Sequence, residues 1–193
     1  MKAFILIGWL ALFGGLMYGT RPKEKSQILP LVNKATVELK AVKGISLVDG
    51  KPFTGTLFEL SPRGDTSSLS GFENGREHGT WKTFYWQAKP RTVRQYQHGK
   101  KIGELKSWHE NGTLMAEATF KNDEYDGVLK EWDENGQQLR EANYQMGYEG
   151  GPQRAWYPNG KVRSNYVVEN GRRYGLLGTK NCSNVSDRLL DNR

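Results

Sequence analysis

Glycine recurs at one phase of a 24-residue period, and this period constrains the fold of the 193-residue chain more than any other feature. Further columns keep the same period without insertion or deletion from Gly55 to about Gly171. A fixed period of this length indicates a repeat architecture in which each copy is one supersecondary unit. The first column contains Gly55, Gly79, Gly103, Gly127, Gly151 and Gly175.

Each copy holds two turn signals, so we expect each copy to form a β-hairpin. One is an Asn-Gly pair such as Asn111-Gly112, and the other lies near the end of the copy, as at Asn74-Gly75. Asn-Gly is the strongest short hairpin signal, because a type I′ turn needs positive φ at both central residues. In the second copy "WQAKPR" replaces the Asn-Gly pair, so we expect a different loop there.

Aromatic residues form two more columns, and a lone hairpin is too marginal to bury them. Each aromatic face must be covered by the next unit, which makes the predicted array cooperative. We expect the columns to stack as a structural ladder along the sheet, and the alternative is an aromatic ligand site. The ladder comprises Phe84, Trp108, Trp132 and Trp156 in one column and Phe72, Tyr96, Phe120 and Tyr144 in the other.

These patterns predict an all-β fold, an elongated single-sheet antiparallel meander built from five 24-residue β-hairpin repeats. The array covers residues 37–175, and its N-terminal part around Asp49-Gly50 reads as a capping strand or partial hairpin. Residues 176–193 read as a C-terminal cap and a polar tail. The repeats are residues 55–78, 79–102, 103–126, 127–150 and 151–174.

The first 20 residues predict an apolar signal peptide or an uncleaved membrane anchor helix ahead of the array. An uncharged apolar run from Ala3 to Gly19 follows Lys2, and its length is near the lower limit for a membrane span. A cut after Gly19 would place Met17 at position −3, which is a poor cleavage site. Residues 21–36 read as a linker. We expect an exported or membrane-anchored protein of the periplasm or cell envelope, and basic residues on both sides of the run leave the cytoplasmic face of a membrane as an alternative.

The net charge of +7 is concentrated at the two ends of the chain. Residues 1–25 and 172–193 each carry a net +3, which leaves +1 for residues 26–171. Nucleic-acid binding needs a dense basic face, so the sequence predicts no nucleic-acid partner. The single cysteine, Cys182, excludes an intramolecular disulfide and reads as an incidental thiol, with a redox or intermolecular role as the alternative.

A third column is basic in four of five copies and is the candidate binding stripe. Strands lie about 4.8 Å apart, so equivalent side chains two strands apart are expected about 10 Å apart. The stripe is interpreted as a solvated face that also opposes edge pairing, or as a surface for an acidic protein, an anionic glycan or lipid headgroups. It comprises Lys82, Lys106, Lys130 and Arg154.

The sequence predicts no catalytic residue, cofactor or metal site. His78, His98 and His109 occupy different phases of the repeat, so we expect them not to gather into a ligand set. Acidic stretches such as "NDEYD" coincide with turns, where Asp and Asn are expected anyway, and lack the spacing of a calcium loop. An enzyme directed at glycans, with turn carboxylates in a concave pocket, is the rival interpretation.

The pattern of glycine, a large apolar residue two positions on (Leu57, Trp81, Leu105, Leu129), an aromatic five on and a later Gly turn resembles the MORN-repeat variant. The opening "DGKPFTG" at residues 49–55 is typical of such arrays. The likeness extends to the antitoxin-like YwqK family. It implies consecutive β-hairpins and a non-catalytic protein that binds a protein partner or membrane lipid. The expected function is a binding or scaffold module at the bacterial cell envelope, with an antitoxin that neutralises a toxin by direct contact as the alternative.

Overall fold

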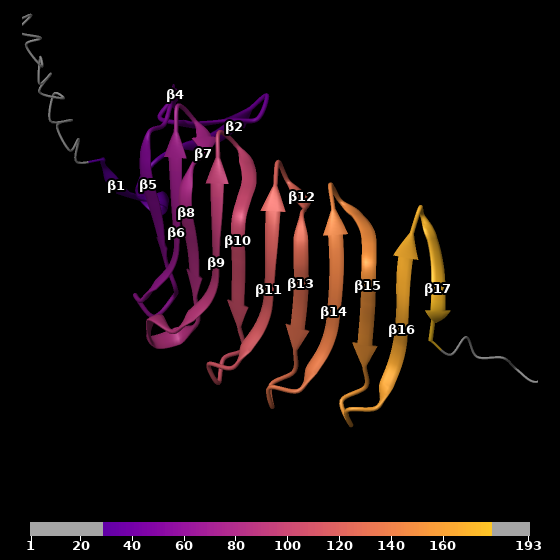
Figure 1. Cartoon of the computed structure of the whole chain (residues 1–193). Coiled ribbons are helices and arrows are strands. Elements are labelled where there is room, and N and C mark those ends of the chain that lie inside the picture. Colours follow the sequence, from indigo (N-terminus) through magenta and orange to yellow (C-terminus); the bar gives the residue numbers. More distant parts are fainter. Residues whose placement is uncertain (1–28, 179–193) are drawn as a thin grey trace, which may run out of the picture.

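The computed structural model describes residues 29–178 as one long sheet with a small sheet at its N-terminal end (Figure 1). The predicted signal or anchor segment at residues 1–20 lies outside the described residues, as does Cys182. Between residues 29 and 178, no helix is both long and apolar enough to cross a membrane.

Fourteen strands form the large sheet. They are β1 (Leu31–Asn33), β5 (Gly55–Leu60), β6 (Thr66–Glu73), β7 (Arg76–Glu77), β8 (Gly79–Phe84), β9 (Pro90–Gln97), β10 (Lys100–Trp108), β11 (Leu114–Lys121), β12 (Glu124–Tyr125), β13 (Gly127–Trp132), β14 (Gln138–Gln145), β15 (Tyr148–Trp156), β16 (Val162–Glu169) and β17 (Arg172–Leu176). The small sheet contains β2 (Leu39–Val42), β3 (Ile45–Val48) and β4 (Lys51–Pro52). The described helices are the 3-10 turns η1 (Lys34–Thr36) and η2 (Trp86–Ala88).

The main strands from β5 to β17 lie side by side in chain order, which confirms the prediction of consecutive β-hairpins. Figure 1 shows them as an extended row of hairpins, with the turns of one kind along the upper rim and the loops along the lower rim. The strand order follows the sequence because each 24-residue copy adds two strands whose open edge is paired by the next copy.

Two features differ from the predicted single antiparallel sheet. First, β1 pairs with β5 in parallel, with Leu31 opposite Thr56, so the large sheet is mixed. A parallel pair needs a long crossover connection, and residues 34–54 supply one. Second, that crossover folds into the separate sheet β2–β3–β4. The start of β1 falls within residues 21–36, the segment predicted as a linker.

The turns of the upper rim are type I′ turns, whereas the recurrent Asn-Gly pairs of the lower loops do not form type I′ turns. Asn74 and Gly75 have φ of 49° and 77°, and other upper turns repeat this pattern. In the lower loop only Gly112 has positive φ, and its N–H donates to His109 O at 2.9 Å. That is a three-residue loop ending in a left-handed glycine. The predicted type I′ turn at Asn111-Gly112 was therefore wrong, because the strand register there leaves one more residue in the loop.

The predicted exception in the second copy is confirmed. There η2 replaces the Asn-Gly loop, and Gln87 and Ala88 carry positive φ.

The core is concentrated at the N-terminal end. Leu57 and Phe72 are buried together with Phe53, and Val48 of the small sheet packs against them. Further along the row, burial falls on single small or apolar residues of one face, such as Ala118 and Leu129. The small sheet therefore acts as a cap over the first hairpin.

Candidate functional site

The two faces of the large sheet carry different columns of the repeat. Directly opposed residues share a face, and Leu105 opposes Ala118 while Lys106 opposes Glu117. The apolar column and the second aromatic column therefore lie on one face, called here the ladder face. The basic column lies on the other, called here the charged face.

Ring contacts follow the second aromatic column of the ladder face. Phe72 lies 6.1 Å from Phe53 and 5.5 Å from Trp81 between ring centroids, and Trp81 lies 4.7 Å from Tyr96. These contacts join neighbouring strands, as the ladder prediction requires for Phe72 and Tyr96. Sequence reasoning missed Phe53 as a rung, because an aromatic residue recurs two positions before the column glycine in only one other copy.

A second run of rings continues toward the C-terminal end. Phe120 lies 4.5 Å from Tyr125, which in turn lies 5.1 Å from Tyr144. Lys101 bridges the gap before this run, since it opposes Tyr96 in the sheet and its Nζ lies 5.7 Å from the Phe120 ring centroid. Such contacts between cation and ring are favourable. Tyr125 is another residue of the ladder that the two aromatic columns of the sequence did not include.

The first aromatic column lies at the lower rim. Each of its members is the last residue of a strand and is half-buried, and a shift of register precedes it. Side chains next to this column link adjacent copies through main-chain oxygens. Tyr85 Oη donates to Trp108 O at 3.0 Å, and His109 Nε2 lies 2.9 Å from Trp132 O. His109 therefore holds neighbouring loops together. The column comprises Phe84, Trp108, Trp132 and Trp156.

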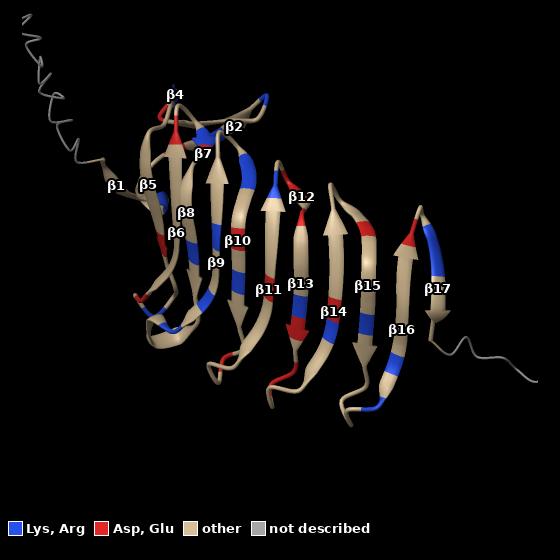
Figure 2. Ribbon diagram, viewed as in Figure 1, with Lys and Arg blue, Asp and Glu red and all other residues tan. Residues whose placement is uncertain are grey.

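The predicted basic stripe lies in one row, but glutamates from the intervening strands are interleaved with it. Lys130 lies between Glu117 and Glu141 across the sheet, and its Nζ is 3.7 Å from Glu117 Oε1. Arg154 Nη1 is 3.5 Å from Glu141 Oε1. Figure 2 shows the resulting alternation of blue and red bands from β10 to β15. The charged face is thus a row of exposed, alternating ion pairs rather than a field of one sign.

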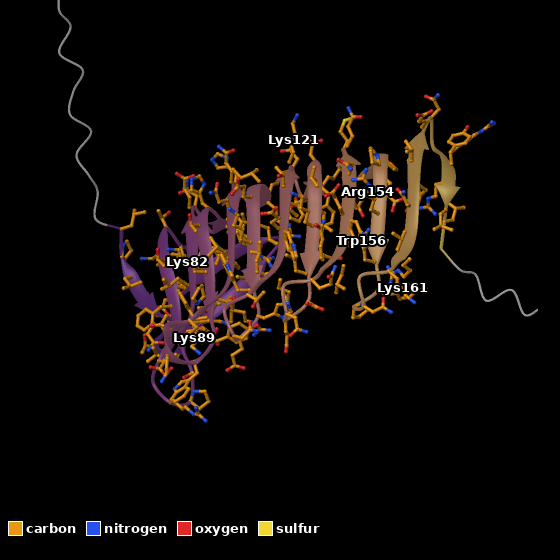
Figure 3. The ribbon with its side chains drawn as sticks, turned by 60° about the horizontal axis from the view of Figure 1, so that its bottom comes forward. Lys82, Lys89, Lys121, Arg154, Trp156 and Lys161 are labelled. Atoms are coloured by element: carbon orange, nitrogen blue, oxygen red, sulfur yellow. The ribbon has the colours of Figure 1, made fainter. Side chains whose placement is uncertain are left out.

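Lys82 and Lys106 belong to the same row. Lys82 is flanked by Leu69 and Val93, and Lys106 Nζ lies 3.3 Å from Glu104 Oε2. In Figure 3 the labelled Lys82 and Arg154 lie along their strands, whereas Trp156 and Lys161 lie toward the lower loops.

Positive charge collects instead at the C-terminal end of the array. Residues 29–138 contain equal numbers of basic and acidic side chains, whereas residues 139–178 contain six basic and three acidic ones. A shallow concavity of about 620 Å³ lies at this end. Its lining includes residues of both faces, among them Arg140, Glu141, Gln153, Arg154, Arg163, Ser164, Tyr166 and Arg173.

Besides Arg154, two arginines in the concavity are held by neighbours. Arg140 Nη2 donates to Tyr144 Oη at 2.7 Å, and Arg173 Nη2 donates to Glu149 Oε2 at 2.9 Å. Arg163 makes no ion pair within residues 29–178. The concavity can therefore bind an anionic group, because Arg163 has no ion pair within residues 29–178 and Arg140 and Arg173 are oriented by their partners.

Gln153 is the polar exception in the apolar column. It is only 2% exposed and stands where other copies have Leu57, Trp81, Leu105 or Leu129. Its Nε2 donates to Asn143 O at 2.7 Å, while its buried Oε1 accepts no hydrogen bond from any described residue. An unpaired buried acceptor is costly, so a buried water that donates to this oxygen would stabilise the position.

Tyr166 opposes Gln153 in the sheet and adds a hydroxyl to the concavity. Burial raises the pKa of Tyr166 above 10.0, and the nearby Glu149 carboxylate raises it further, while Arg173 acts in the opposite direction. Its Oη lies 3.2 Å from Glu149 Oε2. The phenol therefore stays protonated near neutral pH and donates a hydrogen bond.

The histidines do not all stay apart. The expectation is wrong for His78 and His98, whose ring centroids lie 5.2 Å apart with Glu73 beside both. Different phases do not separate them, because each junction between copies places a turn residue against a residue 20 positions earlier. An offset of 20 in the sequence was the signal that would have found this pair.

Comparison with known proteins supports the repeat assignment over part of the chain. The model of the MORN repeat variant matches residues 101–122, 125–146 and 149–170, at the 24-residue period found here. No curated protein matches the chain.

Solved structures of TarM share a distant likeness. One is a TarM mutant of S. aureus in complex with Fondaparinux, alpha-GlcNAc-glycerol and UDP, at 13% identity and a TM-score of 0.33. Another is TarM at 14% identity and a TM-score of 0.32. Each alignment covers 57% of this chain and 21% of the TarM chain, so this chain spans about a fifth of that protein. The match to the model of the MORN repeat variant is therefore confined to three tandem copies within residues 101–170.

Proposed function

We propose that this chain is a non-catalytic binding or scaffold protein of the bacterial cell envelope that holds an anionic partner at the C-terminal end of its array. MORN repeats generally bind proteins or membranes, and three copies match that model. The observation that carries the proposal is the concavity with Arg163 and the oriented Arg173.

The partner is an acidic protein surface. The charged face is a less suitable surface for an acidic partner than the concavity, because its lysines already face glutamates such as Glu117 and Glu141. Exposed pairs of this kind contribute little energy and leave little net field. Anionic lipid or glycan is the alternative for the same chemistry.

A pair of adjacent positions on β16 tests the proposal. Ser164 lines the concavity, whereas the adjacent Asn165, opposite Arg154, does not. A photo-crosslinking residue placed at each position of the full-length chain in its native host should give a discrete protein adduct from Ser164 and not from Asn165. The adduct should weaken as salt rises, because exposed charge contacts are screened. Equal adducts from both positions, or none from Ser164, would contradict the proposed site.

The envelope location rests on the apolar run at residues 3–19. Protease treatment of intact spheroplasts should degrade the array if it faces outward. Protection would place it in the cytoplasm and favour the antitoxin alternative, in which the same acidic partner is a toxin.

A further inference from the structure

Three potential metal ligands meet at the upper rim between the first two copies. Glu73 Oε2 lies 3.1 Å from His78 Nδ1 and 3.3 Å from His98 Nε2, and all three atoms lie within 4.8 Å of one another. Glu73 ends β6, His78 directly precedes β8, and His98 lies in the turn between β9 and β10. Three separate segments thus contribute one ligand atom each.

The backbone fixes the positions of these residues. His78 N donates to Gly71 O at 2.9 Å, and Gly99 N donates to Glu77 O at 2.8 Å, so the turn containing His98 is tied to the segment containing His78. Other junctions pair the equivalent residues. Asn74, the equivalent of His98, donates its main-chain N–H to Oγ1 of Thr54, the equivalent of His78, at 2.9 Å. The cluster therefore uses a contact that the repeat builds at each junction.

Among the junctions within residues 29–178, only this one brings together three side chains that bind metals well. The equivalents of Glu73, His78 and His98 are Gln97, Ile102 and Asn122 at the next junction, Lys121, Asp126 and Met146 at the following one, and Gln145, Gly150 and Asn170 after that. Turn formation does not call for histidine, since the position of His98 is Asn74, Asn122 or Asn170 in three other copies and no other copy has histidine at the position of His78. The three residues are a local departure from the repeat that turn chemistry leaves unexplained.

The distances between these ligand atoms fit a tetrahedral divalent metal ion. Two ligand atoms about 2.0–2.1 Å from a tetrahedral Zn²⁺ lie about 3.3 Å apart. The Nδ1 atom of His78 is buried, and its contact with Glu73 lacks hydrogen-bond geometry, so this atom has no hydrogen-bond partner among the described residues. In the neutral tautomer protonated at Nε2, Nδ1 carries a lone pair that is available to a cation.

We propose that Glu73, His78 and His98 form an exchangeable binding site for a transition-metal dication, with Zn²⁺ as the best-fitting ion. Two imidazoles and one carboxylate are ligands that Zn²⁺ accepts, and three protein ligands leave a coordination position open. The side chain of His98 is 66% exposed and that of Glu73 42%, so the ion has access from solvent. A bound ion would join the first two hairpins at the rim, and its open position would be free for water or a partner's side chain.

The array itself supplies the replacement residues for the test. His98→Asn removes the imidazole but installs the residue that the equivalent type I′ turns use at Asn74, Asn122 and Asn170. Glu73→Gln and His78→Thr follow the same rule, taking the residues found at Gln97 and Thr54. His109→Tyr is the control, because Tyr85 has the equivalent position and His109 lies in a lower loop.

Zn²⁺ would be titrated calorimetrically into the full-length chain prepared without a polyhistidine tag, with Mg²⁺ as the comparison ion. The wild type and His109→Tyr should each bind one equivalent of Zn²⁺ and melt at a higher temperature with it. His98→Asn should weaken binding by more than the about 10–100-fold that loss of an outer-shell partner typically costs. Co²⁺ absorption in the visible range should reveal the same difference.

Two results would overturn the proposal. One is a wild type without saturable binding of one Zn²⁺, and the other is a His98→Asn variant that binds as the wild type does. Circular dichroism would check that His98→Asn is folded. This variant preserves the turn, so it tests the proposal even if Glu73→Gln or His78→Thr destabilises the rim. The site is independent of the proposed partner surface, so failure of either leaves the other standing.

Discussion

Replacing Phe72 by alanine tests the inference that the core is concentrated under the N-terminal cap. Phe72 is 7% exposed and contacts the rings of Phe53 and Trp81. Truncation of a buried phenylalanine typically costs about 3–5 kcal/mol, of which part comes from the cavity left behind. The small sheet holds this region in place and limits its collapse, so we expect about 3–4 kcal/mol for Phe72→Ala.

Phe120→Ala is the matched control, since Phe120 holds the same position two copies later. Phe120 is half-buried on an open face, so it loses only part of the about 1.5–3 kcal/mol that full burial provides. We expect about 1 kcal/mol. Urea unfolding of the full-length chain, followed by far-UV circular dichroism and by the fluorescence of tryptophans such as Trp81, would measure both free energies. If Phe120→Ala costs as much as Phe72→Ala, the core is spread evenly along the array and the reasoning fails.

Three further changes have defined outcomes. Met146 is 62% exposed in a type I′ turn with φ of 47°, so Met146→Asn should raise the free energy of unfolding by about 0.5–1 kcal/mol in urea titrations, and a loss would contradict the turn assignment. Lys130→Glu would place a third carboxylate between Glu117 and Glu141, and we expect a loss of about 0.5–1 kcal/mol that shrinks in high salt, measured as melting temperature at two salt concentrations. The pKa of Tyr166 is raised in the fold, so its contribution to stability is complete below about pH 10 and is lost as pH rises through the folded pKa; unfolding midpoints measured upward from about pH 9 should fall less in Tyr166→Phe than in the wild type.

The sequence predicted the hairpins well because turn chemistry is local. Asn74-Gly75 and its equivalents require positive φ at both central residues, and the structure has them there. The loop at Asn111-Gly112 was assigned to the wrong turn type, because loop length depends on the register of the flanking strands. The parallel pairing of β1 with β5 had no local signal at all, since it depends on the path of a crossover of about twenty residues.

The candidate sites were predicted less completely, for a related reason. Comparing copies at the same phase placed Lys106 and Lys130 correctly in one row, but it compared only alternate strands. The interleaved Glu117 comes from the strand between them and has a different phase. The approach of His78 to His98 was missed in the same way, because contacts across a junction join different positions of the repeat.

The sequence by itself determined the period, the two strands of each copy and the division into a ladder face and a charged face. These follow from turn residues and alternation, which act within one copy. Only the tertiary structure decided which residues of different phase become neighbours, because pairing brings intervening strands and successive turns together. The neutralised lysine row, the arginine concavity around Gln153 and the Glu73–His78–His98 cluster all depend on that pairing.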